Sequence, residues 1–222
     1  MPAPQMPPRQ CNERCQLFRE ARALNPDPPH AFQVRRNARR LFLALHRLHK
    51  LGDPEWKLLE AGALLHDIGQ RVDYRSHHKH SRDLILSRPW PGLSEEERAI
   101  VACLARYHRK RFPRPDDKVY RDLSPTMQQV VQKLGGILRI ADGLDRAHAA
   151  SVRAIGAQVT PGAVHLLVVQ RTQRPADLLA AMKKSDLFSR AFDATLEISP
   201  VTPRFPWQEL RSFQTVEIPE DH

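Results

Sequence analysis

Apolar residues recur every three or four positions over most of the first 150 residues, which is typical of amphipathic helices. The first long stripe follows Asp27-Pro28, a pair that suits the N-cap and the first turn of a helix. Its members are Val34, Ala38, Leu41, Leu45 and Leu48. We therefore expect a long helix that begins near residue 28.

A second stretch, from Leu58 to Ile68, is almost wholly apolar and predicts a buried helix. Asp53-Pro54 opens this helix, and Gly69 suits its C-cap. The helix ends at the adjacent pair His66-Asp67. Because two ionisable side chains at the end of a buried helix are costly unless something compensates them, a metal ion is the leading explanation for the pair.

Three further helices are expected before residue 150. A loop that contains residues 74–78 leads to a short helix at about 81–87. Ser94 and Glu97 form the capping-box pattern ahead of a second helix, and Ser124-Pro125 starts a third. Both of the longer helices carry an apolar stripe that should face a common core.

Near residue 150 the pattern changes to short β-branched segments. Residues 152–159 and 163–170 predict two strands joined by a turn at Pro161-Gly162. A helical stretch at about 175–192 and a strand at about 194–199 follow. The predicted fold is therefore mainly α, with a small C-terminal α/β appendage.

The composition fits one good-sized globular domain plus that appendage, with 222 residues of which 41% are hydrophobic. No apolar run approaches the roughly 18 residues that cross a bilayer, and the N-terminus lacks a signal peptide, so we expect a cytoplasmic protein that binds no membrane. Three cysteines exclude a disulfide framework. The predicted division is a flexible tail at 1–16, a helical domain at 17–150, and an α/β domain with an irregular C-terminal tail at 151–222.

The net charge of +10 and the pI near 10.1 favour an anionic partner. A phosphorylated metabolite, polyphosphate and nucleic acid all meet that description. The basic residues are spread over several segments, and aromatic residues make up only 6% of the chain, without a strip on which bases could stack. We therefore do not expect a nucleic-acid partner.

Other helices also aim ionisable side chains inward. His30, His108 and Asp142 each lie four residues from an apolar member of their own helical stripe, so each should point into the core together with His66 and Asp67. A single inward histidine is usually a hydrogen-bonded packing residue. Five inward groups are better explained by a metal site, and a mixed imidazole and carboxylate shell suits Mn, Fe, Ni, Co or Zn.

The order of His30, His66-Asp67 and Asp142 resembles that of the HD-domain metal-dependent phosphohydrolases. More closely, five segments resemble, in order, the C-terminal half of the exopolyphosphatase / guanosine pentaphosphate phosphatase family: DPPHAFQVRRNARRLF, AGALLHDIG, HHKHSRDLIL, ARYHRKR and GGILRIADGLDRA. The resemblance implies an HD-type helical bundle followed by that family's small last domain. The chain lacks the N-terminal actin-like domains that perform the family's known chemistry, so we expect a stand-alone domain with chemistry of its own.

By this resemblance, a first metal ion would be held by His30, His66, Asp67 and Asp142. A second ion would be held by His80 and His108, with His78 close behind and Asp67 as the bridge. The alternative for the histidines at 77, 78 and 80 is that they are exposed and bind nothing. Asp67 and His66 would act in catalysis together with a water molecule activated by the metal.

Cations near these ligands are candidates for binding substrate phosphates. Lys79 lies between two histidines, and Arg109-Lys110 directly follow His108. Arg139 and Arg146 flank Asp142 on the same helix face. The alternative for both arginines is an ion pair with Asp142 or Asp145 that merely orients the acid.

The favoured function is a stand-alone phosphohydrolase that uses one or two divalent ions (Mn, Fe, Ni, Co, Mg or Zn). It would act on a small phosphate ester, a nucleotide or a phosphoanhydride. The alternative is a non-catalytic module that binds polyphosphate or a nucleotide and partners a separate phosphatase. An oligomer is compatible with either function, because the appended strands offer an edge to a second subunit.

Overall fold

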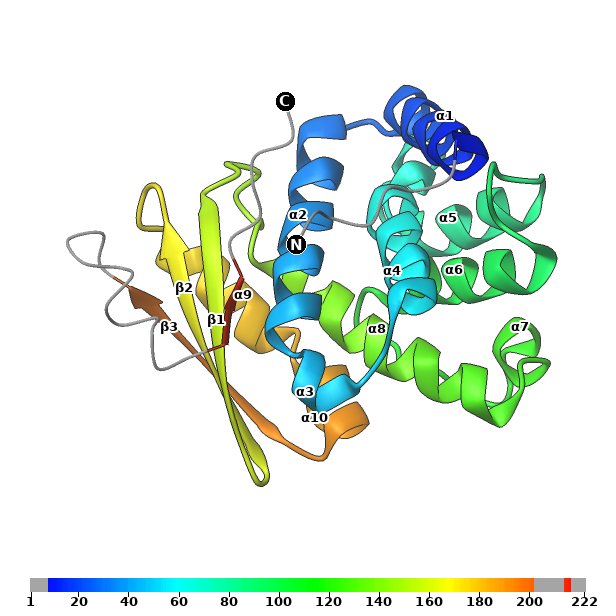
Figure 1. Cartoon of the computed structure of the whole chain (residues 1–222). Coiled ribbons are helices and arrows are strands. Elements are labelled where there is room, and N and C mark those ends of the chain that lie inside the picture. The colour runs from blue at the N-terminus through cyan, green and yellow to red at the C-terminus, as the bar shows by residue number, and fades with distance from the viewer. Residues whose placement is uncertain (1–7, 202–213, 217–222) are drawn as a thin grey trace.

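The computed structural model describes residues 8–201 and 214–216. The N-terminal part is helical (Figure 1), and its buried apolar side chains belong to a core that continues into the C-terminal part. They are α1 (Pro8–Leu24), α2 (Pro28–Ala44), the short α3 (His46–His49), α4 (Asp53–Leu65), the 3₁₀ turn η1 (Ile68–Arg71), α5 (His77–Leu86), α6 (Glu95–Tyr107), the short α7 (Lys118–Arg121) and α8 (Pro125–Gly143).

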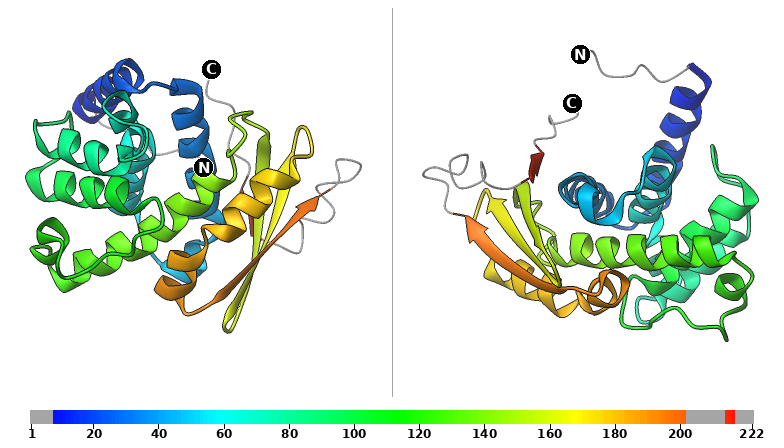
Figure 2. Two further views of the ribbon diagram at one scale, coloured as in Figure 1. Left: turned by 180° about the vertical axis from the view of Figure 1, so that it is seen from behind. Right: turned by 60° about the horizontal axis from the view of Figure 1, so that its bottom comes forward.

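The C-terminal part is a small α/β unit. Its elements are β1 (Val152–Thr160), β2 (Ala163–Gln170), α9 (Pro175–Lys183), α10 (Asp186–Phe192), β3 (Thr195–Val201) and β4 (Gln214–Val216). The sheet order is β3-β2-β1-β4, with β1 antiparallel to both β2 and β4, and β2 parallel to β3. The parallel pair requires a crossover, which α9 and α10 supply beside α8 (Figure 2). The predicted class, mainly helical with a small α/β unit, is confirmed.

The predicted helix starts are confirmed where a cap was visible in the sequence. The Asp27 side chain accepts a hydrogen bond from the His30 N–H at 3.1 Å and so caps α2. Ser94 and Glu97 form the reciprocal capping box of α6, at 3.2 and 2.8 Å. Local side-chain chemistry therefore sets where these two helices begin.

Three boundaries differ from the prediction. Helix α1 covers residues 8–16, which the sequence assigned to a flexible tail, and it packs Leu17 and Ala21 into the core. Helix α4 ends at Leu65 rather than at Ile68, and α5 begins at His77 rather than near residue 81. The predicted tails at 1–7, 202–213 and 217–222 lie outside the described residues. No helix in the described part of the chain is long and apolar enough to cross a bilayer.

Helix α8 joins the two parts through close backbone packing. A Cβ atom placed on Gly143 would lie 2.5 Å from the Cα of Ala181, so only glycine lets α9 approach α8 this closely. Beyond the end of α8, Asp177 of α9 accepts a hydrogen bond from the Ala147 N–H at 2.8 Å. The start of the α/β unit is thereby fixed against the helix that carries Asp142.

Arg139 belongs to this junction and not to a phosphate site. The side chain is only 1% exposed, and its guanidinium donates to the carbonyls of Tyr107 and Arg111 at 2.7 and 2.6 Å. It also pairs with Asp186 at 2.6 Å. The prediction of Arg139 as a substrate-binding residue is therefore wrong, and its partner is Asp186 rather than Asp142 or Asp145. Each of these N–H groups already donates to a protein oxygen, so it does not contact a substrate.

Replacing Arg139 by Met should therefore destabilise the protein. The change leaves two carbonyl groups without their donor and removes the partner of the half-exposed Asp186 carboxylate, which predicts a loss of about 2–4 kcal/mol. For a chain of this length, that loss lowers Tm by about 10 °C. Thermal unfolding followed by circular dichroism measures the effect, with Arg146→Met, an exposed position just beyond α8, as the matched control. Equal melting temperatures for the two variants would contradict the structural role.

Candidate metal centre

The pair His66-Asp67 lies where α4 gives way to η1. His66 is the C-cap of α4 and is fully buried, and Asp67 is the N-cap of η1 and is 7% exposed. The Nε2 atom of His66 and the Oδ1 atom of Asp67 have no hydrogen-bond partner among the described residues. Buried polar atoms without partners are costly, so the arrangement calls for a further ligand at this point.

Two groups of potential ligands meet here. In the first, His30, His66 and Asp142 each offer a ligand atom, and these atoms lie within 4.8 Å of one another. The His30 Nε2 atom lies 3.6 Å from Oδ1 of Asp142. The residues come from α2, the end of α4 and α8, which are far apart in sequence. The structure thus brings together three of the four residues expected at the first ion.

The second group consists of Asp67, His77 and His108, within the same 4.8 Å limit. Oδ1 of Asp67 lies 3.2 Å from His77 Nε2 and 3.5 Å from His108 Nε2. The other oxygen, Oδ2, lies 3.4 Å from His66 Nε2 and accepts a hydrogen bond from Gln70 at 2.5 Å. Asp67 therefore has one oxygen toward each group, which is the geometry that a bridging carboxylate requires.

The four histidines of the two groups, His30, His66, His77 and His108, are all held by a hydrogen bond from Nδ1. Their Nδ1 atoms donate to the carbonyls of Ala63, Tyr74 and Ala105 or, for His30, to the carboxylate of Asp145, at 2.6–2.8 Å. This arrangement leaves Nε2 as the atom that faces the centre, and such outer hydrogen bonds are characteristic of metal-binding histidines. Two of these atoms, on His77 and His108, lie only 3.1 Å apart. Two lone pairs at that distance repel unless a proton or a cation lies between them, so the residues present fit a metal.

The pKa values of His30 and His108 are shifted in opposite directions. Burial would lower the pKa of His30, but hydrogen bonding to Asp142 and Asp145 outweighs burial and raises this pKa to about 10. Burial likewise would raise the pKa of Asp142, yet the nearby Lys184 ammonium and His30 hold it well below its usual value. In the second group, burial and the adjacent His66 keep the pKa of His108 well below the ordinary value. His108 is therefore neutral, as a metal ligand must be.

The position of His77 depends on Gly69. A Cβ atom on Gly69 would lie 2.3 Å from both the His77 carbonyl oxygen and the Ser81 nitrogen, so glycine is needed for η1 to touch the backbone of α5. The Gly69 N–H also donates to Ser81 Oγ at 2.9 Å. The role predicted for Gly69, the C-cap of α4, is therefore replaced by a packing role. Gly69 lets the first turn of α5 pack against η1, the turn that follows His66-Asp67.

His80 and His78 do not join either group. Both are half-buried, and His77, which was not among the predicted ligands, lies in the group where His80 was expected. The pKa of His78 is lowered to about 4 by burial and by the neighbouring Arg106 and Arg109.

Four of the cations predicted to bind substrate phosphates lie on the surface. Lys79, Lys110 and Arg146 are exposed, and the exposed Arg109 donates to the Arg75 carbonyl at 3.0 Å. Their role in binding substrate stays a prediction.

The structure also adds residues that the sequence reasoning missed as parts of the site. Asp145 anchors His30, and Lys184 contacts the second oxygen of Asp142. His148 stacks on the His30 ring at 4.0 Å and pairs with Asp27 at 2.6 Å. Asp145 lies three residues after Asp142, and this spacing in the sequence could have indicated that the two side chains lie close together. No local pattern points to Lys184.

Comparison with protein families supports the resemblance to the exopolyphosphatase / guanosine pentaphosphate phosphatase family. The family model described as Ppx/GppA phosphatase, domain III, matches residues 19–174. The chain belongs to this family. The matched range spans the helical part and continues through the β1-β2 hairpin, so domain III of the Ppx/GppA family crosses the boundary predicted near residue 150.

A curated Ppx/GppA relative is similar over a shorter range. It is the guanosine-5'-triphosphate,3'-diphosphate pyrophosphatase of Pseudoalteromonas translucida (strain TAC 125), which is 33% identical over 84 residues. The aligned residues make up 38% of this chain and 16% of the relative. The similarity therefore concerns a small part of a much longer protein.

Substituting the histidines of α5 tests whether His77, as the structure indicates, or His80, as the sequence predicted, is a ligand of the second group. We expect His77→Ala to lower the bound divalent metal from about two ions per chain to about one, because it removes a ligand of the second group. His80→Ala, the matched control on the same helix, should leave the content unchanged. Elemental analysis of protein purified without a chelating tag measures both. Loss of metal in the His80 variant alone would contradict the assignment.

Metal binding by the first group should release a proton. With a pKa of about 10, His30 is protonated at neutral pH in the metal-free protein, so a cation must displace the Nε2 proton. Because the proton and the metal compete for one lone pair, affinity should rise about tenfold per pH unit through the neutral range. Calorimetry in buffers of different ionisation enthalpy should give about one proton released per ion in this group. An affinity that does not change with pH would exclude His30 as a ligand.

Proposed function

We propose that this chain is a metal-dependent phosphohydrolase that cleaves a phosphate ester or phosphoanhydride of a small molecule, such as a nucleotide. The observation that carries the proposal is the pair of buried ligand groups that share Asp67. Divalent cations bound there would lower the pKa of a coordinated water and offset charge on phosphoryl oxygens. No protein nucleophile is then required.

The protein's own residues would hold and orient the reacting groups. His30, His66 and Asp142 would hold one cation, and Asp67, His77 and His108 the other. The four Nδ1 hydrogen bonds fix the ring planes in advance, so little side-chain entropy is lost when ligands bind. The surrounding apolar side chains exclude bulk water and strengthen the electrostatic interactions inside the centre.

The net charge and the name of one relative support the proposed substrate class. The net charge of +10 favours an anionic ligand. The Pseudoalteromonas relative is named for cleaving a pyrophosphate linkage of a guanosine polyphosphate, so a nucleotide phosphoanhydride is the first substrate to test. We propose that the exposed Lys79, Arg109, Lys110 and Arg146 contribute to binding the polyphosphate.

One observation favours a second function, a non-catalytic module that binds polyphosphate or a nucleotide. The Lys184 ammonium pairs with Asp142 and so gives that carboxylate a counter-ion without a metal. In such a module, phosphate binding would persist in the presence of a chelator and would ignore changes at His66 and Asp67. Strict metal dependence would count against it.

An activity panel tests the proposed function. Purified protein is assayed with Mn, Co, Ni and Mg against phosphate esters, nucleotides and nucleotide polyphosphates, and phosphate release is measured. We expect turnover that a chelator abolishes. The double variant His66→Ala, Asp67→Ala should lose about 10³-fold in kcat/KM, because metal stabilisation of the transition state is worth several kcal/mol.

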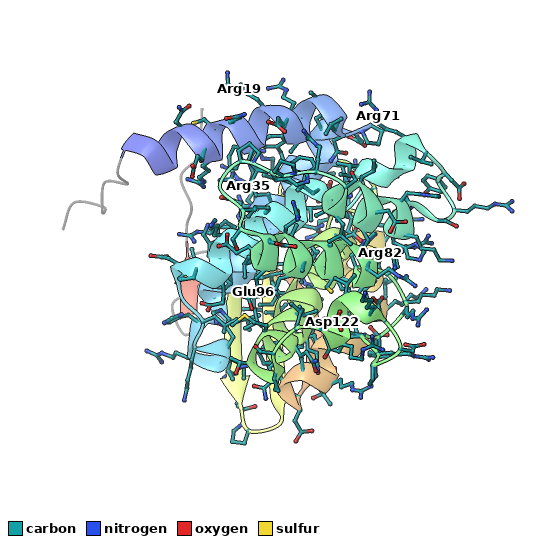
Figure 3. The ribbon with its side chains drawn as sticks, turned by 90° about the vertical axis from the view of Figure 1, so that its right-hand side faces the viewer. Arg19, Arg35, Arg71, Arg82, Glu96 and Asp122 are labelled. Carbon is teal, nitrogen blue, oxygen red and sulfur yellow. The ribbon has the colours of Figure 1, made fainter. Side chains whose placement is uncertain are left out.

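Glu96→Ala is the matched carboxylate control. Glu96 is exposed in the first turn of α6, at the opposite end of that helix from His108 (Figure 3), and its loss should leave kcat/KM unchanged. Equal activity in the wild type and in the His66, Asp67 double variant would refute the proposed function.

A further inference from the structure

A lysine of the small α/β unit reaches the candidate metal centre. The Nζ atom of Lys184 contacts Oδ2 of Asp142, whereas Oδ1 of the same carboxylate faces His30. The two oxygens of Asp142 are therefore divided between the ammonium and the ligand group. A cation held through Oδ1 would leave the contact to Lys184 intact.

The backbone around Lys184 is held in place from both sides. Lys184 is the C-cap of α9, and its N–H donates to the carbonyls of Ala180 and Ala181 at 3.1 Å. Ala181 packs on the bare backbone of Gly143, the neighbour of Asp142. On the other side, Asp186 is fixed by its ion pair with the buried Arg139. The backbone that carries Lys184 is therefore held in place beside Asp142.

Lys184 has donors to spare. An ammonium carries three N–H donors, and within residues 8–201 and 214–216 Asp142 uses one of them. The side chain is 29% exposed, whereas that of Asp142 is 11% exposed, so Lys184 lies where the centre opens to solvent. A ligand that enters beside Asp142 would meet this ammonium.

The charge of a filled centre also calls for an anion. Two divalent cations and Lys184 carry more positive charge than Asp67, Asp142 and Asp145 can neutralise. An excess positive charge in a buried site is costly unless an anion accompanies it. A phosphate group has the charge and the acceptor oxygens to contact a metal ion and an ammonium at the same time.

We propose that Lys184 is a phosphate-binding residue, through which the small α/β unit completes the centre and grips a non-bridging phosphoryl oxygen of the substrate. This inference rests on the proposed function, since it assumes that metal ions occupy the two groups. Lys184 keeps its contact with Asp142 and gives its remaining donors to the phosphate. It takes no part in the bond changes and holds the substrate in position.

The test measures two quantities on the full chain. Metal content is determined by elemental analysis, and binding of inorganic phosphate to the metal-loaded protein is determined by calorimetry. We expect Lys184→Met to keep its metal and to bind phosphate about 10- to 100-fold more weakly, the loss typical of a hydrogen bond to a charged group. Lys183→Met, a change at the adjacent exposed lysine, should match the wild type in both measurements. Lys184→Arg, which keeps the charge, should retain most of the phosphate affinity.

Each other outcome has a definite meaning. Wild-type phosphate affinity in Lys184→Met would overturn the proposal, as would tighter metal binding with unchanged phosphate affinity, which would make Lys184 a competitor of the metal. A wild type that holds metal but binds no phosphate would overturn it and leave the metal centre standing. A wild type that holds no metal would refute the proposed function. In that case phosphate binding that still depends on Lys184 would support the lysine's role, and its absence would overturn that role.

Discussion

The rest of this structure depends on one constraint, the close burial of the His30, His66, His77 and His108 rings beside the Asp67 and Asp142 carboxylates in a largely apolar helical core. Such groups cost several kcal/mol unless each is satisfied. The hydrogen bonds from Nδ1 satisfy one nitrogen of every ring and turn the other nitrogen, Nε2, inward. The Nε2 atoms of His77 and His108 lie 3.1 Å apart, and when both rings are neutral no proton lies between them. The same bonds that stabilise the rings thus create a centre that a cation completes.

Much of this arrangement could be predicted from the sequence, because helical spacing reports which side chains face inward. His30, His66, Asp67, His108 and Asp142 were all expected to point into the core, and the structure brings these five residues together. The exception is instructive. The buried stripe of α5 is His77, Ser81 and Ile85, four residues apart, and counting back from Ile85 would have selected His77 over His80. The prediction failed because the helix was started too late.

Other parts could not be predicted, because they depend on contacts between distant segments. Arg139 shares a helix with Asp142, which made it look like a phosphate ligand, but the carbonyls and the carboxylate that capture it lie 28 to 47 residues away in sequence. The approach of α5 to η1 and of α9 to α8 depends on glycines at 69 and 143. The first of these positions looked like an ordinary helix end. The spacing of apolar residues identifies the buried face of a helix, but it does not identify which segment packs against that face.

Helix α8 shows why the two parts of the chain act together. Its last turn carries Asp142, and the turn that follows it carries Asp145, which anchors His30. On the same helix, Arg139 holds α10 and Gly143 holds α9. A change in the α9-α10 connection would therefore act on the electrostatics of the centre through Lys184 and Asp142. The boundary near residue 150 separates two kinds of secondary structure, whereas the centre takes side chains from both sides of it.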